Sequence, residues 1–404
     1  MDNNLKKQLG CIMIITGTEI GAGILALPII TAKLGFILSS IVMLLAWCLM
    51  TYTALLIADI SLSMPAGSSF AAIAKRTLGD SGAILAWISF LFLMYCISVA
   101  YISAASSAFH ILLNNISRNT WSIIFVAILG GIVVIGTTAV DLINRILLTT
   151  KLICLVLVCL FLLKHIDTSN LMVKPVELND TLKVAIPVIV TSFTSHIIVP
   201  TLTEYLNRNA KVLFQVIFYG SIIPLFLYLL WLIAVLGVLP LHGEISFMHS
   251  IFSYTNVELA NVGDVLQALN QKITTSAATI SLSIFTDISV ITSYLGVSLA
   301  LYHFNIDSYR LYRLPSIKLK IIIAILLTFM IPLFINVAYP NLFISAISYV
   351  GVSIGVSLLI MPSIIAYKLS KQKNHVFYYK ISRIRYCWFI AFIVGAGIVI
   401  INFI

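Results

Sequence analysis

The chain has 404 residues, of which 61% are hydrophobic and only 9% are charged. Soluble domains carry about 25% charged residues, so this composition excludes an ordinary soluble protein. The formal net charge of +10 could suit a nucleic-acid partner. The apolar runs argue otherwise, because each is close to the roughly 20 residues that cross a bilayer as a helix. They predict an all-α polytopic membrane protein.

Apolar runs separated by short polar loops predict eleven membrane-spanning helices. The predicted spans are 9–33, 35–63, 81–112, 121–139, 146–166, 182–206, 212–239, 265–302, 317–335, 337–366 and 386–404. The apolar run after Lys6 and Lys7 is too long for a cleavable signal peptide. No predicted loop is large enough to hold a soluble active site, so any function is expected within the membrane.

The basic residues divide unequally between the two sides of the predicted membrane. With the N-terminus in the cytoplasm, the inside set is Lys6, Lys7, Lys75, Arg76, Arg145, Lys151, Arg208, Lys211, Arg310, Arg313, Lys318, Lys320, Lys368, Lys371, Lys373, Lys380, Arg383 and Arg385. The outside set is Lys33, Arg118, Lys164, Lys174 and Lys183, and Lys272 lies within or near a span. Cytoplasmic loops carry the excess of Lys and Arg, so a cytoplasmic N-terminus and a periplasmic C-terminus are predicted.

The first predicted span contains the stretch GTEIGAGILALP, from Gly17 to Pro28. Glycine lets a helix open, and unwound backbone at membrane depth is tolerated only where it lines a cavity or is buried in protein. The stretch therefore predicts a break near residues 17–23. Close helix packing is the alternative, because Gly17 and Gly21 form a GxxxG pair.

The sixth predicted span reads AIPVIVTSFTSHIIVPTLTEYL, in which Pro187 and Pro200 flank a polar cluster. This favours a second break near residues 191–196. Two interrupted helices five spans apart are typical of inverted-repeat transporters, which bind substrate where both helices break. Half-helix N-termini suit a carboxylate and freed carbonyls suit an ammonium, so a zwitterionic amino acid is the predicted substrate. The predicted units are 1–166 (spans 1–5), 167–368 (spans 6–10) and 369–404 (a basic cytoplasmic loop and span 11).

The stretch GTEIGAGILALP resembles the G-T-x-I-G-A-G-M-L-A-L-P signature of the bacterial hydroxy/aromatic amino acid permease family, and within it the tyrosine-specific permeases. The resemblance continues in order through AIPVIVTSFTSH, GSIIPLFLYLLW, FTDISVITSYLGVSLAL and YPNLFISAISYVGV. It implies a LeuT-type 5+5 inverted-repeat fold with an eleventh helix, and proton-driven amino acid uptake across the inner membrane. The chain departs from the family at Glu19, where a small or apolar residue is usual. Thr194 and Ser195 also replace a Gly-aromatic pair before His196.

The predicted substrate site combines the residues at the two breaks with one tyrosine of the third span. Its members are Thr18, Glu19, Ile20, Gly21, Ala22, Gly23, Tyr101, Ser192, Phe193, Thr194 and His196. Small residues around Tyr101 leave room for a bulky ligand on which an aromatic ring can stack, while ordinary helix packing is the alternative. Spacing does not separate tyrosine from tryptophan, phenylalanine, serine or threonine, so the aromatic preference rests on the resemblance.

Ionisable residues at bilayer depth are costly and mark functional sites by default. Asp287, near the centre of the eighth span, is the predicted proton carrier, and a structural acid is the alternative. Lys151 lies about two turns into the fifth span. Resemblance to the wider amino acid/polyamine/organocation transporters implies that its ammonium replaces a bound sodium ion and reaches the break in the first span. Snorkelling to the interface is the alternative. Glu19, Thr292 and Ser293 complete the predicted ion site.

The resulting prediction is a proton-coupled inner-membrane symporter that imports an aromatic amino acid, with tyrosine first among the candidates. A serine/threonine permease, a sodium-coupled permease and a non-transporting amino acid sensor are the alternatives. An enzyme is not predicted, because no HExxH metal motif occurs. No cofactor, metal ion or protein partner is predicted beyond the amino acid substrate and membrane lipids, since the six cysteines lie in or beside apolar runs without metal-type spacing.

Overall fold

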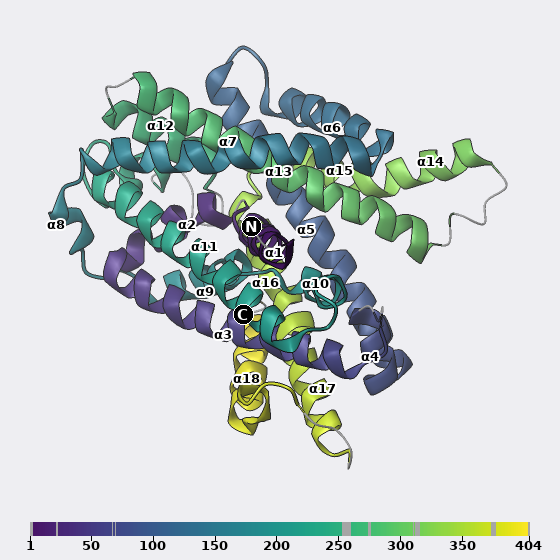
Figure 1. Ribbon diagram of the computed structural model, residues 1–404. Coiled ribbons are helices and arrows are strands. Elements are labelled where there is room, and N and C mark those ends of the chain that lie inside the picture. Colours follow the sequence, from purple (N-terminus) through teal and green to yellow (C-terminus); the bar gives the residue numbers. More distant parts are fainter. Residues whose placement is uncertain are drawn as a thin grey trace.

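The computed structural model describes residues 3–21, 23–66, 68, 70–252, 260–273, 276–309, 311, 316–372 and 377–402. All regular secondary structure in these ranges is helical (Figure 1). Within them, nine helical stretches are long and apolar enough to cross a membrane, and the first of these is the joined stretch Gly23–Ser63. The prediction of an all-helical protein with many apolar helices is confirmed.

The helices follow one another with short connections. Their bounds are α1 (Asn3–Glu19), α2 (Gly23–Thr31), α3 (Gly35–Ser63), α4 (Phe70–Leu78), α5 (Asp80–Leu112), α6 (Arg118–Ile135), α7 (Thr137–Leu163), α8 (Thr168–Leu171), α9 (Leu178–Ser192), α10 (Val199–Tyr205), α11 (Ala210–Val238), α12 (Val262–Lys272), α13 (Ser276–Ser308), α14 (Ile317–Ile325), α15 (Ile331–Ala338), α16 (Phe343–Ile354), α17 (Met361–Ser370) and α18 (Arg385–Ile401). Two π-helical segments, Leu326–Met330 and Gly355–Ile360, join α14 to α15 and α16 to α17. α3 has the bounds predicted for the second span, 35–63.

The boundary between α6 and α7 corrects the predicted fourth and fifth spans, 121–139 and 146–166. α6 ends at Ile135 and α7 begins at Thr137. Gly136 separates them at φ 132°, a backbone conformation that side-chain-bearing residues rarely adopt. Lys151 therefore lies near the middle of α7 and not two turns from its start.

The predicted eighth span, 265–302, is wrong at its start. Residues Val262–Lys272 form a separate helix, α12, and α13 begins only at Ser276. One side of α12 is apolar and buried, while Gln267 and Lys272 on its other side are exposed. An amphipathic helix of this kind lies on its neighbours through one face, so the apolar residues of α12 do not belong to a spanning segment.

The first long apolar stretch is interrupted between α1 and α2. α1 ends at Glu19, and α2 begins at Gly23. The Gly21 N–H donates to the Glu19 carbonyl at 2.7 Å, a short turn that departs from the i→i−4 bonding of an α-helix. The predicted site residue Ala22 lies outside the described residues.

A second interruption separates α9 from α10. α9 ends at Ser192, and the chain becomes helical again in a 3-10 turn at His196–Ile198 that leads into α10. Pro200 lies in the first turn of α10, where its missing N–H would have had no intrahelical partner. The non-helical residues are thus 193–195, inside the stretch that the sequence marks with polar side chains between two prolines.

Both interruptions lie inside the helix bundle. α1 packs against α11, and α2 packs against α9, so the two interrupted stretches are neighbours. Around them α13 packs on α7 and α5, and α5 packs on α16. In Figure 1, α1 is seen near the middle of the molecule with the other helices surrounding it. This arrangement buries Ile20 and Gly21 after α1, and Phe193 and Ser195 after α9.

Candidate functional site

The two interruptions contact each other directly. A Cβ added to Gly23, the first residue of α2, would lie 2.5 Å from Ser192 Oγ and 3.1 Å from Ser192 Cα, so glycine permits this approach. From the second interruption, Ser195 Oγ donates a hydrogen bond of 2.7 Å to Glu19 Oε1. Residues far apart in the sequence therefore form one buried site.

Glu19 brings an acidic group into this site. The residue is 4% exposed, and its Oε1 accepts the hydrogen bond from Ser195. Its Oε2 has no hydrogen-bond partner among the residues that the structure describes. A buried carboxylate oxygen without a donor is unfavourable, so Oε2 is suited to receive a donor from a ligand or a proton.

Tyr228 of α11 connects the two interruptions, and the sequence analysis missed it. Its hydroxyl lies 2.6 Å from the Glu19 carbonyl oxygen and 2.9 Å from the Ser192 carbonyl oxygen. Glu19 and Ser192 are the last residues of α1 and α9, whose carbonyls lack the usual helical donors. The tyrosine is fully buried, and its ring packs edge-on against Phe193 with 5.3 Å between centroids. α11 carries two tyrosines among mostly apolar residues, and nothing local in the sequence distinguishes Tyr228 from Tyr219.

Lys151 of α7 points into the same region. It is 1% exposed, and its Nζ donates to the Ile20 carbonyl oxygen at 2.6 Å and contacts Thr292 Oγ1 at 3.4 Å. The side chain thus ends at the first interruption and not at an aqueous interface. The Nζ supplies a positive charge to a carbonyl that the interrupted helix leaves without its usual donor.

His196 lies behind the second interruption. It is 2% exposed, and its Nε2 lies 2.8 Å from Thr53 Oγ1, which also donates to the Met50 carbonyl. A hydroxyl has one proton, so Thr53 accepts from Nε2–H of His196. Nδ1 has no partner in the described part of the chain.

Two further predicted residues surround the first interruption. A Cβ on Gly21 would lie 3.0 Å from the Tyr101 hydroxyl oxygen and 3.2 Å from Ser293 Oγ. Tyr101 belongs to α5 and Ser293 to α13. The structure therefore places a hydroxyl from each of these two helices next to the bare backbone at Gly21.

Two of the predicted threonines use their hydroxyls to bond the preceding turn of the adjoining helix. Thr18 is exposed and donates to the Ile14 carbonyl, and Thr194 is partly buried and donates to the Val190 carbonyl. These bonds to the preceding turn are the ordinary behaviour of threonine in helices. The structure thus separates the two threonines from the residues that join the interruptions.

Asp287 lies on a different side of α13 from the residues of the site. At 100° per residue it is about 140° around the helix axis from Thr292, which contacts Lys151. It is partly buried, and no hydrogen bond or ion pair holds its carboxylate in the ranges that the structure describes. The two acids predicted for ion coupling, Glu19 and Asp287, are therefore in separate environments.

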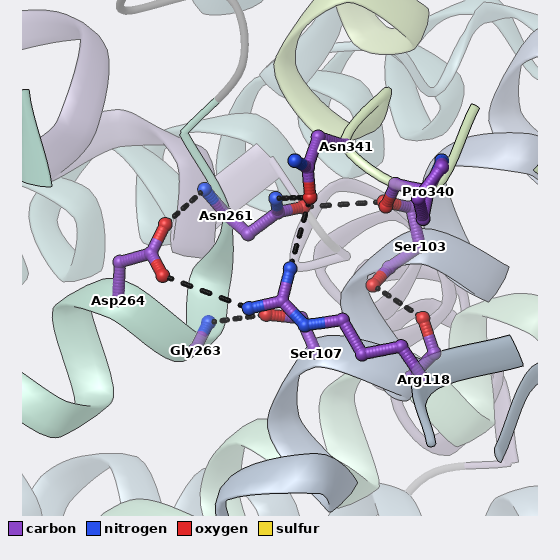
Figure 2. A network of polar contacts seen from close by, with 9 residues as sticks. Ser103, Ser107, Arg118, Asn261, Gly263, Asp264, Pro340 and Asn341 are labelled. Carbon is purple, nitrogen blue, oxygen red and sulfur yellow. Dashed lines mark hydrogen bonds and ion pairs between the residues drawn. The ribbon is translucent and has the colours of Figure 1, made fainter. Parts of the chain in front are cut away.

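A second polar cluster, the α12 network, lies where α12 begins (Figure 2). Its members are Ser103, Ser107, Arg118, Asn261, Gly263, Asp264, Pro340 and Asn341. They come from α5, from the start of α6, from α12 with the residue before it, and from the loop between α15 and α16. The network therefore ties α12 to three other parts of the bundle.

Asn261 is the centre of the α12 network. It is 1% exposed, and its Nδ2 donates to Asn341 Oδ1 at 2.9 Å while its backbone N–H donates to Asp264 Oδ2 at 2.9 Å. Arg118 donates to the same Asn341 oxygen at 2.9 Å and lies 4.0 Å from Asp264 Oδ1. Ser103 donates to Asn261 Oδ1 at 3.2 Å. Asn261 and Asp264 form the capping box at the start of α12, and the bonds with Ser103, Arg118 and Asn341 anchor it.

The profile of the tryptophan/tyrosine permease family matches residues 4–403. The chain is 33% identical to the tryptophan-specific transport protein of Haemophilus influenzae, over 92% of this chain and 90% of that protein. It is 30% identical to tyrosine-specific transport system 2 of the same organism, over 98% and 96% of the two chains. It is also 29% identical to glutamine transporter 2 of Aliivibrio fischeri, over 91% and 90%.

Proposed function

Since the chain belongs to the tryptophan/tyrosine permease family, a family of transporters and not of enzymes, we propose that it is a proton-coupled permease that imports an aromatic amino acid, with tyrosine as the preferred substrate. It is an integral membrane protein whose substrate is a small molecule, an amino acid. The finer proposal is carried by one observation, the contact between the two helix interruptions inside the bundle.

The substrate backbone is proposed to bind where the interruptions meet. The carbonyls of Glu19 and Ser192 converge on the Tyr228 hydroxyl, and lone pairs that this hydroxyl does not use suit an ammonium group. The N-terminal ends of α2 and of the turn that leads into α10 offer free N–H groups and the positive end of the helix dipole, which suit a carboxylate. Tyr101 and Phe193 supply the aromatic surface for the side chain.

The names of similar proteins support a substrate whose side chain is bulky and carries a hydrogen-bond donor. Two of the similar proteins are named for tyrosine and tryptophan, and a third for glutamine. The phenol, the indole and the carboxamide each present an O–H or N–H group. The Oε2 of Glu19, which has no partner among the described residues, is proposed to accept such a donor, which favours tyrosine and tryptophan over phenylalanine.

Proton coupling is proposed from the cation and acids at bilayer depth. The Lys151 ammonium bonds to the Ile20 carbonyl and Thr292, the kind of oxygen pair that would otherwise hold a metal cation, and this favours protons over sodium. Glu19 and Asp287 are the candidate proton carriers. Ser293, beside the first interruption, is proposed as a further member of the ion site. One charge moved through 100 mV supplies about 2.3 kcal/mol, enough for roughly fifty-fold accumulation.

The proposed architecture has eleven spans. α1 with α2 forms the first and α9 with α10 the sixth, so residues 1–166 and 167–368 make two inverted repeats of the LeuT type, and residues 369–404 add the last span. The excess of basic residues places the N-terminus in the cytoplasm and the C-terminus in the periplasm of a bacterial inner membrane. Alternating access around the interruptions is the proposed transport cycle.

Uptake by proteoliposomes tests the proposed function. With an inward proton gradient and no sodium, labelled tyrosine should accumulate above its external concentration, and a protonophore should abolish the accumulation. A competition panel of the twenty amino acids should rank tyrosine and tryptophan above phenylalanine. A strict requirement for sodium, or competition by serine and threonine in preference to aromatics, would support the alternative permeases. Binding without counterflow exchange would support a sensor.

A further inference from the structure

Two carbonyl oxygens that end half-helices share one hydroxyl group. The Tyr228 hydroxyl lies 2.6 Å from the Glu19 carbonyl and 2.9 Å from the Ser192 carbonyl, which lie 173 positions apart in the sequence. Each carbonyl ends a helix whose C-terminal end carries partial negative charge, so the two ends repel each other. A donor between them is needed to hold them close.

The hydroxyl is held in place by its surroundings. Tyr228 is fully buried, and its ring packs against Phe193, the first residue after α9. It is carried by α11, a helix of 29 residues that packs on α1 and α2. The position of the hydroxyl oxygen is therefore fixed by α11, a continuous helix, and residues of both interruptions contact it.

We propose that the Tyr228 hydroxyl sets the distance between the Glu19 and Ser192 carbonyls that receive the ammonium group of the substrate. Tyr228 is then a positioning residue, and the inference rests on the amino acid substrate proposed above. It gives α11 a role in recognition of the substrate backbone that neither interruption has by itself.

The Tyr228 hydroxyl and the substrate ammonium can both donate to the Glu19 and Ser192 carbonyls, and they carry different numbers of protons. A hydroxyl has one proton, so it donates to one of its two acceptors at a time. Each carbonyl oxygen has two lone pairs, and the Gly21 N–H uses one of those on Glu19, so the ammonium uses the second one while the hydroxyl donates to Ser192. An ammonium has three donors and a full charge, and its charge-assisted bonds are about twice as strong as neutral ones. Without the hydroxyl, the two carbonyls would move apart and no longer meet the ammonium together.

Equilibrium binding to the purified Tyr228→Phe variant tests the proposal, because phenylalanine keeps the ring contact with Phe193. The ligands are tyrosine, tyramine, which keeps the ammonium but lacks the carboxylate, and 3-(4-hydroxyphenyl)propanoate, which lacks the ammonium. Affinities are measured by competition with labelled tyrosine into the millimolar range. We expect the Kd for tyrosine and for tyramine to rise about tenfold, the usual effect of one buried hydrogen bond, and that of the propanoate to change less than about twofold.

Tyr294→Phe is the matched control. Tyr294 is also buried, its ring lies 4.8 Å from Phe125, and its hydroxyl has no partner among the described residues. This variant should bind all three ligands as the unmodified protein does. Equal weakening of all three ligands in Tyr228→Phe would assign Tyr228 a purely structural role and overturn the proposal, as would unchanged or tighter binding of tyrosine. Failure of the unmodified protein to bind any amino acid would instead overturn the proposed function.

Discussion

Glu19 and Asp287 are both acids placed within apolar helices, yet they have different neighbours. Glu19 is 4% exposed, bonds to Ser195 and lies in the interruption itself. Asp287 lies on another side of α13 from the Thr292 contact with Lys151. A substrate ligand and a remote proton carrier should respond differently when the charge is removed, and this difference separates the two roles.

We predict that Glu19→Gln lowers both uphill uptake and counterflow exchange. The glutamine amide keeps a bond to Ser195, but it lacks the charge of the carboxylate next to the proposed substrate site. Asp287→Asn should abolish uphill uptake while counterflow continues, because exchange needs substrate binding but no net proton movement. Both variants are measured in the same proteoliposomes, with inward proton gradient for uptake and unlabelled substrate inside for counterflow. Equal loss of the two activities in Asp287→Asn would make Asp287 a structural residue.

Lys151 shows what one residue can reveal once its neighbours are known. Its position in the sequence allowed either an interfacial lysine or one that reaches the first interruption. The structure gives Nζ a 2.6 Å bond to the Ile20 carbonyl and leaves the residue 1% exposed. The earlier start of α7, at Thr137, is the reason, since it moves Lys151 from the end of the helix to its middle.

Among the elements, α12 was the least expected. Its buried apolar residues made it look like the start of a spanning helix, but Asn261 and Asp264 cap it and the α12 network ties it to α5, α6 and the loop before α16 (Figure 2). α12 also contacts α2, α11 and α13. It therefore covers one end of the first interrupted stretch and is held there by polar contacts.

Asp264 lies outside the spanning helices and gives α12 a dependence on pH. Burial raises the pKa of its carboxyl above the ordinary value, against the opposing effects of the Asn261 N–H and of Arg118. A raised pKa means that the folded state holds its proton to higher pH than the unfolded state. The stabilisation is complete below the ordinary aspartate pKa and is lost as pH rises through the folded-state value.

We predict that the melting temperature of the unmodified protein falls relative to that of Asp264→Asn as pH rises from the ordinary aspartate range upward, because asparagine resembles the protonated acid at every pH. Thermal unfolding at a series of pH values measures the difference. Asp80→Asn is the control, since Asp80 is exposed and its ion pair with Lys75 lies at the surface, where such pairs contribute little to stability. A relative gain in stability for the unmodified protein as pH rises would mean that the Arg118 contact outweighs burial.

For the whole molecule, the outer surface is as informative as the interior. Large apolar side chains such as Ile135, Phe334 and Tyr386 are exposed on the outside of the bundle, while polar groups such as Lys151 and Asn261 are buried within it. This inverts the distribution of a soluble protein and matches a molecule whose outer surface contacts lipid.

An odd number of spans requires the two termini to lie on opposite sides of the membrane. In a cysteine-free background, we predict that Lys6→Cys reacts with a membrane-impermeant maleimide only after permeabilisation, whereas Asn402→Cys reacts in intact cells. Lys211→Cys and Lys174→Cys serve as cytoplasmic and periplasmic references, because the basic-residue count places them there. Reaction of both terminal cysteines from the same side would show an even number of spans.

The sequence by itself determined the properties that are written in neighbouring residues. Composition established the helical membrane class, apolar runs located α3 at residues 35–63, and glycine and proline located the interruptions between α1 and α2 and between α9 and α10. The same residues carried the resemblance to a family of amino acid permeases that the comparisons bear out. These features are local because backbone freedom and hydrophobicity act on a few consecutive residues.

Only the tertiary structure decided which distant residues meet. It joined Tyr228 to both interruptions, Ser195 to Glu19 and Lys151 to Ile20. It also placed Asp287 on another side of α13 from Thr292 and separated α12 from the predicted eighth span. Such contacts depend on how whole helices pack and rotate against one another, and that packing sums many weak interactions along each helix. No short stretch of sequence contains this information, so the site became visible only when the helices were placed together.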